Sequence, residues 1–159
     1  MNPQDVLKYG HRTVMRTLEA FPRAQWYTPG ACGRWSVKDL VAHLGSFELV
    51  LAEALENCLS PGPTPLVDQF AGRDQDFNDE QVDRLRKDWT LEAALEEYLS
   101  AHRRVWAAAS QIAPEIWERE GVFPWYGAEY DLEDFVVYAF YGHKREHTGQ
   151  IQVFSDRFV

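Results

Sequence analysis

The sequence has too few cysteines, too little positive charge and too short apolar runs for several classes of protein. Its two cysteines, Cys32 and Cys58, are too few for a disulfide framework, and neither has a CxxC partner. We therefore expect reduced thiols in a cytoplasmic protein. Sixteen basic residues against twenty-five acidic residues give a formal net charge of −9. An acidic chain repels phosphate backbones, so nucleic acid is not an expected partner.

Segments that would span or cross a membrane are also missing. No apolar run approaches the roughly 18 residues that read as a membrane helix. The first residues, MNPQDVLKYGHR, lack the apolar stretch of a secretory signal. The chain has 159 residues, of which 45% are hydrophobic and 14% aromatic, which is enough for one packed core. We expect a single domain over residues 1–159.

Helical periodicity dominates, and neither a useful strand pattern nor an internal repeat is found. The first long helix is expected at about residues 3–20, where apolar residues recur at steps of three and four. The second opens at Ser36, which with Asp39 resembles a capping box, and it ends before the prolines of residues 60–65.

Two more long helices follow. The third starts at Thr90 and ends before Pro114, and the fourth begins at Asp131, a good N-cap residue. In the fourth helix the apolar stripe begins at Phe135 or Val136.

The connections between the long helices are harder to interpret. We expect residues 66–74 to be irregular and Asn78 to cap a short extra helix over about 79–87. The aromatic segment 115–130 is interpreted as a short hairpin or an ordered loop. The prediction is an all-α four-helix bundle whose long second connection permits a crossover.

The fourth helix carries two histidines with the spacing of a helical metal site. His143 and His147 are four residues apart, so their rings lie on one face and reach a common point. His43 falls at the edge of the apolar stripe of the second helix and can meet them in the core. Three neutral imidazoles bind a divalent transition metal and leave a position for water or substrate. The plain alternative is that these are ordinary polar residues at a helix edge.

Other polar residues near this face are weaker candidates for the metal site. Gln150 orients a ligand or makes a packing hydrogen bond. His11 and His102 lie on apolar stripes and are satisfied core histidines, supports for a ligand residue or a fourth ligand. Glu146 is expected to face away from the pair, and Glu48 to be solvated.

Four aromatic residues in the connections are candidates for the mouth of a substrate pocket. They are Trp35, Trp125, Tyr126 and Tyr130. The alternative is that they pack in the loops against the helix ends. Cys32 has two similar interpretations, as a reactive thiol or as a small half-buried residue.

Several motifs together resemble a known family. GRWSVKDLVAHL (33–44), which opens the second helix, and His143, His147, Gln150 and Ile151 in the last one resemble the DinB/YfiT-like superfamily of four-helix bundles. Within it, ACGRWSVKDLVAHLGSFE, DFND, VFPW and GHKREHTGQI resemble the ClbS/DfsB-like branch of colibactin self-protection proteins. The resemblance covers nearly the whole chain.

This resemblance implies a divalent metal, most often nickel or zinc, on His43, His143 and His147. Relatives include thiol-dependent transferases and candidate hydrolases, so a low-molecular-weight thiol is a further expected cofactor. Homodimers are common among them. The expected function is a metal-dependent hydrolase or S-transferase that acts on a small electrophilic molecule, in stress or toxin protection. The alternatives are a non-catalytic protein that sequesters a small ligand and a dimerising helical module.

Overall fold

The first two long helices begin at the caps that the sequence provides. A computed structural model describes residues 2–72 and 74–159. In it α1 (Pro3–Ala20) follows Asn2, whose side chain accepts a hydrogen bond from a backbone amide of the first turn. α2 (Val37–Leu59) follows Ser36, and the capping box between Ser36 and Asp39 is formed in both directions. Both predicted helices are confirmed.

The other two long helical segments also begin as predicted. α5 (Leu91–Ala109) is capped by the Thr90 side chain, and α7 (Leu132–Phe135) by that of Asp131. Each cap satisfies a backbone amide that would otherwise have no partner at a helix start. α5 ends at Ala109, before Pro114, as expected.

The last helical segment changes its winding before it reaches the two histidines. α7 continues without a break into η3 (Val136–Tyr141), a π-helical stretch, and then into α8 (Gly142–Ser155). A wider π turn shifts the register of the helix face. Phe135 and Val136 are therefore both buried, which explains why the sequence pattern could not choose between them.

The connection from α2 to α5 is more helical than the sequence indicated. Residues 66–74 were expected to be irregular, but α3 (Pro65–Phe70) occupies most of this stretch, while residue 73 lies outside the described part of the chain. The short extra helix is present as α4 (Asp74–Asn78) and η2 (Asp79–Arg84), a second π-helical stretch. Asn78 has helical backbone angles and makes no capping bond, so its predicted role as a cap is wrong.

The remaining connections are short or irregular. The 3₁₀ turns η1 (Arg23–Gln25) and η4 (Asp156–Phe158) follow α1 and α8. The aromatic segment after α5 contains α6 (Pro114–Trp117) and then an ordered loop, with no strand among its residues.

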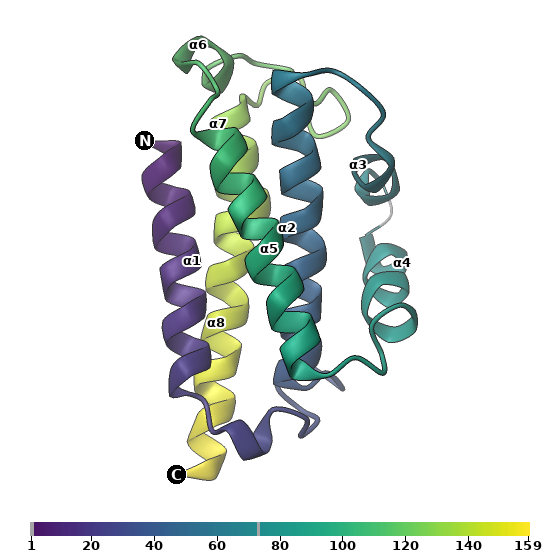
Figure 1. The fold of residues 1–159 in the computed structure, drawn as a ribbon, viewed down its shortest axis with the longest axis vertical. Helices are drawn as coiled ribbons and strands as arrows, with labels where there is room; N and C mark the ends of the chain where they lie inside the picture. The colour runs from purple at the N-terminus through teal and green to yellow at the C-terminus, as the bar shows by residue number, and fades with distance from the viewer. Residues whose placement is uncertain (1, 73) are drawn as a thin grey trace.

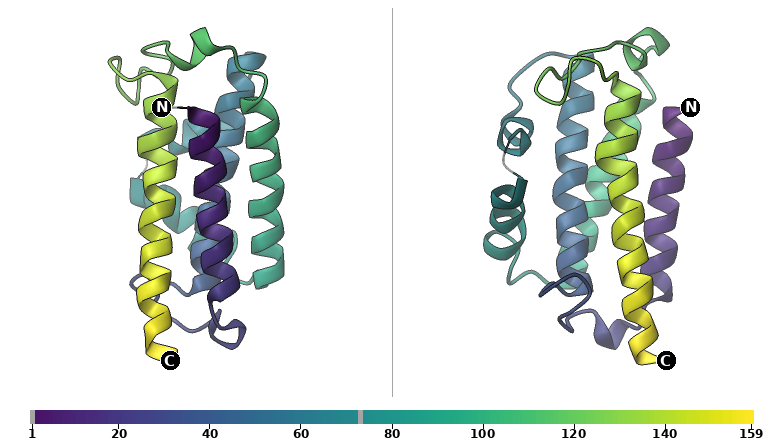
Figure 2. Two further views of the ribbon diagram at one scale, coloured as in Figure 1. Left: turned by 90° about the vertical axis from the view of Figure 1, so that its left-hand side faces the viewer. Right: turned by 180° about the vertical axis from the view of Figure 1, so that it is seen from behind.

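The long helices lie side by side with their axes roughly aligned (Figure 1, Figure 2). α1 and α8 run in one direction, whereas α2 and α5 both run in the other, so the chain must cross back along the bundle between α2 and α5. α3, α4 and η2 make this crossing on the outer side of α2 (Figure 1). The predicted all-α, bundle-like fold is confirmed. Among the described residues no helix combines the length and the apolar character that a membrane crossing requires.

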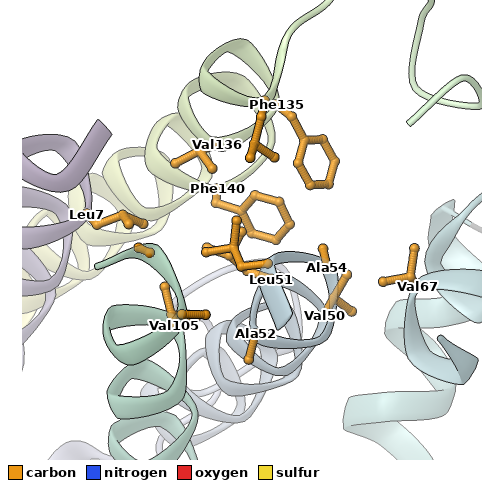
Figure 3. Close-up of a cluster of buried hydrophobic side chains, with 14 of the residues drawn as sticks. Leu7, Val50, Leu51, Ala52, Ala54, Val67, Val105, Phe135, Val136 and Phe140 are labelled. Atoms are coloured by element: carbon orange, nitrogen blue, oxygen red, sulfur yellow. The ribbon is translucent and has the colours of Figure 1, made fainter. Parts of the chain in front are cut away.

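The apolar core consists of two clusters stacked along the bundle axis. The upper cluster joins the C-terminal part of α2 to η3, and Figure 3 shows Leu51, Val105 and Phe140 meeting at its centre. The lower cluster contains Leu40 and Leu44 from the start of α2. Each of the four long helical segments, α7, η3 and α8 being taken as one, contributes to both clusters, and near the junction of the clusters each carries polar residues, listed here in chain order: His11, His43, Glu48, His102, His143, Lys144 and His147.

We expect the capping box of α2 to contribute measurably to stability. Ser36→Ala removes the bond that its hydroxyl oxygen accepts from the Asp39 amide, and should lower the free energy of unfolding by about 1 kcal/mol. Urea denaturation measures this change. Thr13→Ala, which removes an exposed hydroxyl bonded to a backbone carbonyl within α1, is the control and should change it by less than about 0.5 kcal/mol. Equal effects of the two substitutions would contradict the prediction.

Candidate metal centre

Three histidines from two distant segments meet inside the bundle. Nε2 of His43 in α2 lies 2.7 Å from Nε2 of His143 in α8, and Nε2 of His147 lies 2.9 Å from the same atom. One nitrogen from each of the three rings falls within 4.8 Å of the others. The structure therefore brings together the three residues that the sequence analysis selected.

The local structure explains this convergence. His143 and His147 are one turn apart on α8, after the π-helical stretch has set the helix face. His43 lies in the first half of α2, where the helix is buried on nearly all sides. His43 is only 2% exposed and His147 6% exposed. The Phe47 ring stacks on the His143 ring at 4.1 Å between centroids, which restricts how that imidazole can turn.

The nitrogen spacing suits a metal ion. Metal–nitrogen bonds of about 2.0–2.1 Å in a tetrahedral arrangement place ligand nitrogens about 3.3 Å apart. Two of the observed separations, 2.7 and 2.9 Å, are somewhat shorter than this value, and all three nitrogens lie within 4.8 Å of one another. Nδ1 of His43 is buried and has no hydrogen-bond partner among the described residues, so the only polar contact of this ring is at the centre. These residues could hold a divalent metal ion.

Burial keeps all three rings neutral. Burial first, and then the neighbouring imidazoles, lower the pKa of His43 to about 3 and that of His143 to about 2. Burial also lowers the pKa of His147, against the opposing effects of Gln150 and Glu146. A neutral imidazole carries one nitrogen lone pair, which is the form that binds a metal.

Gln150 fixes the orientation of the His147 ring, which fits its predicted role of orienting a ligand. Its Oε1 lies 2.8 Å from Nδ1 of His147. An amide oxygen only accepts hydrogen bonds, so Nδ1 carries the proton and donates it. The lone pair of His147 is then at Nε2, the atom that faces the other two histidines.

The three histidines line an open pocket of about 700 Å³. Trp35 is part of its wall, with its ring centroid 5.0 Å from that of His43. Cys32 also lines it, at the start of a tight turn in which Gly33 has a φ of +56°. Four more side chains line the pocket that were not predicted from the sequence to lie there: Arg34, Asn78, Asp79 and Glu146.

These misassignments have separate causes. Asn78 and Asp79 come from the crossover connection, and no local pattern could bring that segment to α2 and α8. Glu146 was expected to face away from the histidine pair, but the pocket is wide enough to include this exposed carboxylate at its edge.

The predicted aromatic mouth is only partly formed. Trp125, Tyr126 and Tyr130 do not line this pocket, and pack instead in the ordered loop before α7. Trp125 and Tyr126 contact Phe135 at the upper end of the bundle. The loop-packing alternative therefore describes these three residues, and Trp35 alone of the four is at the pocket.

His11 and His102 belong to a second polar cluster beside the histidine centre. Their rings stack at 3.8 Å between centroids, and His11 Nδ1 lies 3.1 Å from the Tyr98 hydroxyl. His102 Nδ1 lies 3.3 Å from Oε2 of Glu48. Among the described residues, neither the His11 ring nor the His102 ring contacts the three converging histidines. This agrees with the interpretation of His11 and His102 as satisfied core residues.

Glu48 was expected to be solvated, and this prediction is wrong. Its side chain is completely buried, with Lys144 and His102 as partners. Burial alone would raise its pKa, but these two partners hold the pKa at about 2, so the carboxylate stays ionised. The spacing of Glu48 on α2 could not reveal these partners because both come from other helices.

The fold and the site together define an all-helical bundle with a buried three-histidine centre. The model of the DinB superfamily matches residues 7–151, and the chain belongs to this superfamily. No curated protein and no solved structure matches the chain.

The second polar cluster should make stability depend on pH. Burial, His102 and Lys144 lower the pKa of His11 from 6.5 to about 4. Below pH 6.5 the unfolded chain therefore binds a proton at His11 that the folded protein does not bind until about pH 4. The free energy of unfolding should therefore decrease as the pH is lowered from 6.5 to about 4. The decrease should be less steep in His11→Phe, which keeps the ring stack.

Urea denaturation at several pH values, with a chelator present, measures the difference between the two slopes. Tyr9→Phe, an exposed change on the same helix, is the control and should keep the slope of the unaltered protein. A His11→Phe slope equal to that of the unaltered protein would show that His11 does not contribute.

Proposed function

We propose that the protein binds a divalent transition metal on His43, His143 and His147 and uses it in a reaction on a small electrophilic molecule. The observation that carries this proposal is the meeting of three neutral imidazole nitrogens at one side of an open pocket. Three protein ligands leave a coordination position open, as in catalytic rather than structural sites. The resemblance of the motifs favours nickel or zinc.

In this proposal the metal and the pocket residues have separate roles. A bound divalent metal supplies a Lewis acid that lowers the pKa of a water or thiol ligand toward neutrality. Trp35 offers an apolar wall for the electrophile, and the exposed Glu146 carboxylate is available to accept a proton. The reaction is hydrolysis when the nucleophile is water, and S-transfer when it is a small thiol.

The finer family assignment belongs to the same proposal. The motifs around His43 and His143 support the ClbS/DfsB-like branch, and the shared direction of α2 and α5 supports a four-helix bundle with a crossover. We further propose that residues 1–159 act as one domain, as a homodimer in the cytoplasm, in protection against stress or a toxin.

A second candidate function is sequestration without turnover. Trp35 and Phe47 place aromatic rings beside the histidine centre, and such rings retain apolar ligands. Here the histidines would serve only to fix the pocket.

Metal loading should depend on each of the three histidines. Purified protein that is stripped with a chelator and loaded with nickel or zinc should hold about one equivalent of metal. His43→Ala should weaken binding by about 100-fold or more, at or beyond the upper end of the range for residues that only support a ligand. Elemental analysis gives the stoichiometry and competition with a chelator gives the affinity.

His11→Phe serves as the matched histidine control and should bind metal normally, while circular dichroism shows that both variants are folded. If the unaltered protein holds no stoichiometric metal after loading with either ion, the proposed function is wrong.

Turnover separates the enzyme from the sequestering protein. The metal-loaded protein, mixed with an excess of a small electrophile and a thiol such as glutathione, should convert many equivalents per polypeptide. Mass spectrometry of the product and of the intact protein measures this. Consumption that stops at one equivalent would favour sequestration, and His143→Ala should remove catalysis but not passive binding to the aromatic wall.

A further inference from the structure

A buried ion pair joins the two helices that carry the histidine centre. Nζ of Lys144 in α8 contacts Oε1 of Glu48 in α2, and the two residues are 4% and 0% exposed. Lys144 directly follows His143, and Glu48 lies just over one turn beyond His43 on α2. α2 and α8 therefore meet at two adjacent points, one between imidazoles and one between opposite charges.

Such a pair is a poor way to gain stability. Removing two charges from water is strongly unfavourable, and apolar residues of similar size often stabilise a core equally well. Glu48 and Lys144 lie between two apolar clusters, where a continuous apolar core was the obvious alternative. A role other than stability therefore has to be considered for this pair.

The pair does constrain the position of α8 along α2. Sliding a helix by one residue moves it about 1.5 Å and turns its side chains by about 100°. An apolar interface penalises such a slip mainly through packing, because one apolar contact can partly replace another. A slip of α8 would separate Lys144 from Glu48 and leave two buried charges without partners, which is strongly unfavourable.

Contacts to the other two long helices extend this constraint. Glu48 also pairs with His102 of α5, whose ring stacks on His11 of α1. The Lys144 ammonium lies 5.9 Å from the centroid of the Tyr98 ring of α5. All four long helices are thus tied to one polar layer at the level of the histidine centre.

We propose that the Glu48–Lys144 ion pair sets the register of α8 against α2 and thereby holds His143 opposite His43. The proposal rests on the proposed metal function. Glu48 and Lys144 are positioning residues: neither is among the residues lining the pocket or forming the centre. The histidine spacing within α8 is fixed by the helix itself, so the pair acts on the contact between α8 and α2.

The test replaces the pair without leaving a lone buried charge. In Glu48→Gln/Lys144→Met the amide oxygen still accepts a bond from His102, and Met fills the volume of the lysine stem. Thermal unfolding should remain cooperative, whereas the Kd for Ni²⁺ should rise by about 10- to 100-fold. The visible spectrum of the Co²⁺-loaded protein should also change, because it reports the ligand geometry directly.

Two further variants complete the experiment. Glu56→Gln removes the exposed ion pair with Arg104 between α2 and α5, and should leave the Kd and the Co²⁺ spectrum unchanged. Glu48→Asp keeps the charge but shortens the side chain, and should weaken Ni²⁺ binding by about tenfold. If the double variant does not fold, this single variant decides the question.

The possible outcomes separate the two proposals. A variant with a lower melting temperature but an unaltered Kd and Co²⁺ spectrum shows a purely structural pair and overturns the positioning role. Native protein that binds neither Ni²⁺ nor Co²⁺ overturns the proposed metal function and the positioning role together. Weaker binding with a changed spectrum in a folded variant supports both.

Discussion

The convergence of three imidazole nitrogens in the bundle interior is the constraint on which the rest of the candidate site depends. Burial keeps His43, His143 and His147 neutral, so their lone pairs face one another with few other polar partners. Packed aromatic rings and the Gln150 side chain hold the rings in this arrangement. A centre of this kind needs rigid walls, because a displacement of 1 Å would separate the nitrogens.

The crossover connection turns this centre into a pocket. Because α2 and α5 run in the same direction, the chain between them must return along the bundle, and it passes beside the histidines. Asp83 of η2 ties the crossing segment to the loop before α2, since it accepts a bond from Nε1 of Trp35 at 3.1 Å and pairs with Arg34. The crossover thus supplies one wall of the pocket, and the loop before α2 supplies another.

Local signals in the sequence were sufficient for the helices and for part of the centre. Ser36 and Asp131 were identified as caps, and Thr90 as a helix start, because these signals depend on residues within one turn. The pairing of His143 with His147 follows from helix geometry alone. Asn78 failed as a cap because the chain continues as a π helix through that position, and π-helical stretches have no simple sequence pattern.

The sequence by itself determined where the long helices begin and which two histidines lie one turn apart, because these properties arise between near neighbours in the chain. Only the tertiary structure decided that His43 reaches that pair, that Glu48 is buried against Lys144, and that Trp125 lies at the upper end of the bundle. These contacts depend on the relative register and direction of helices far apart in the chain, which no periodicity within a single helix can specify.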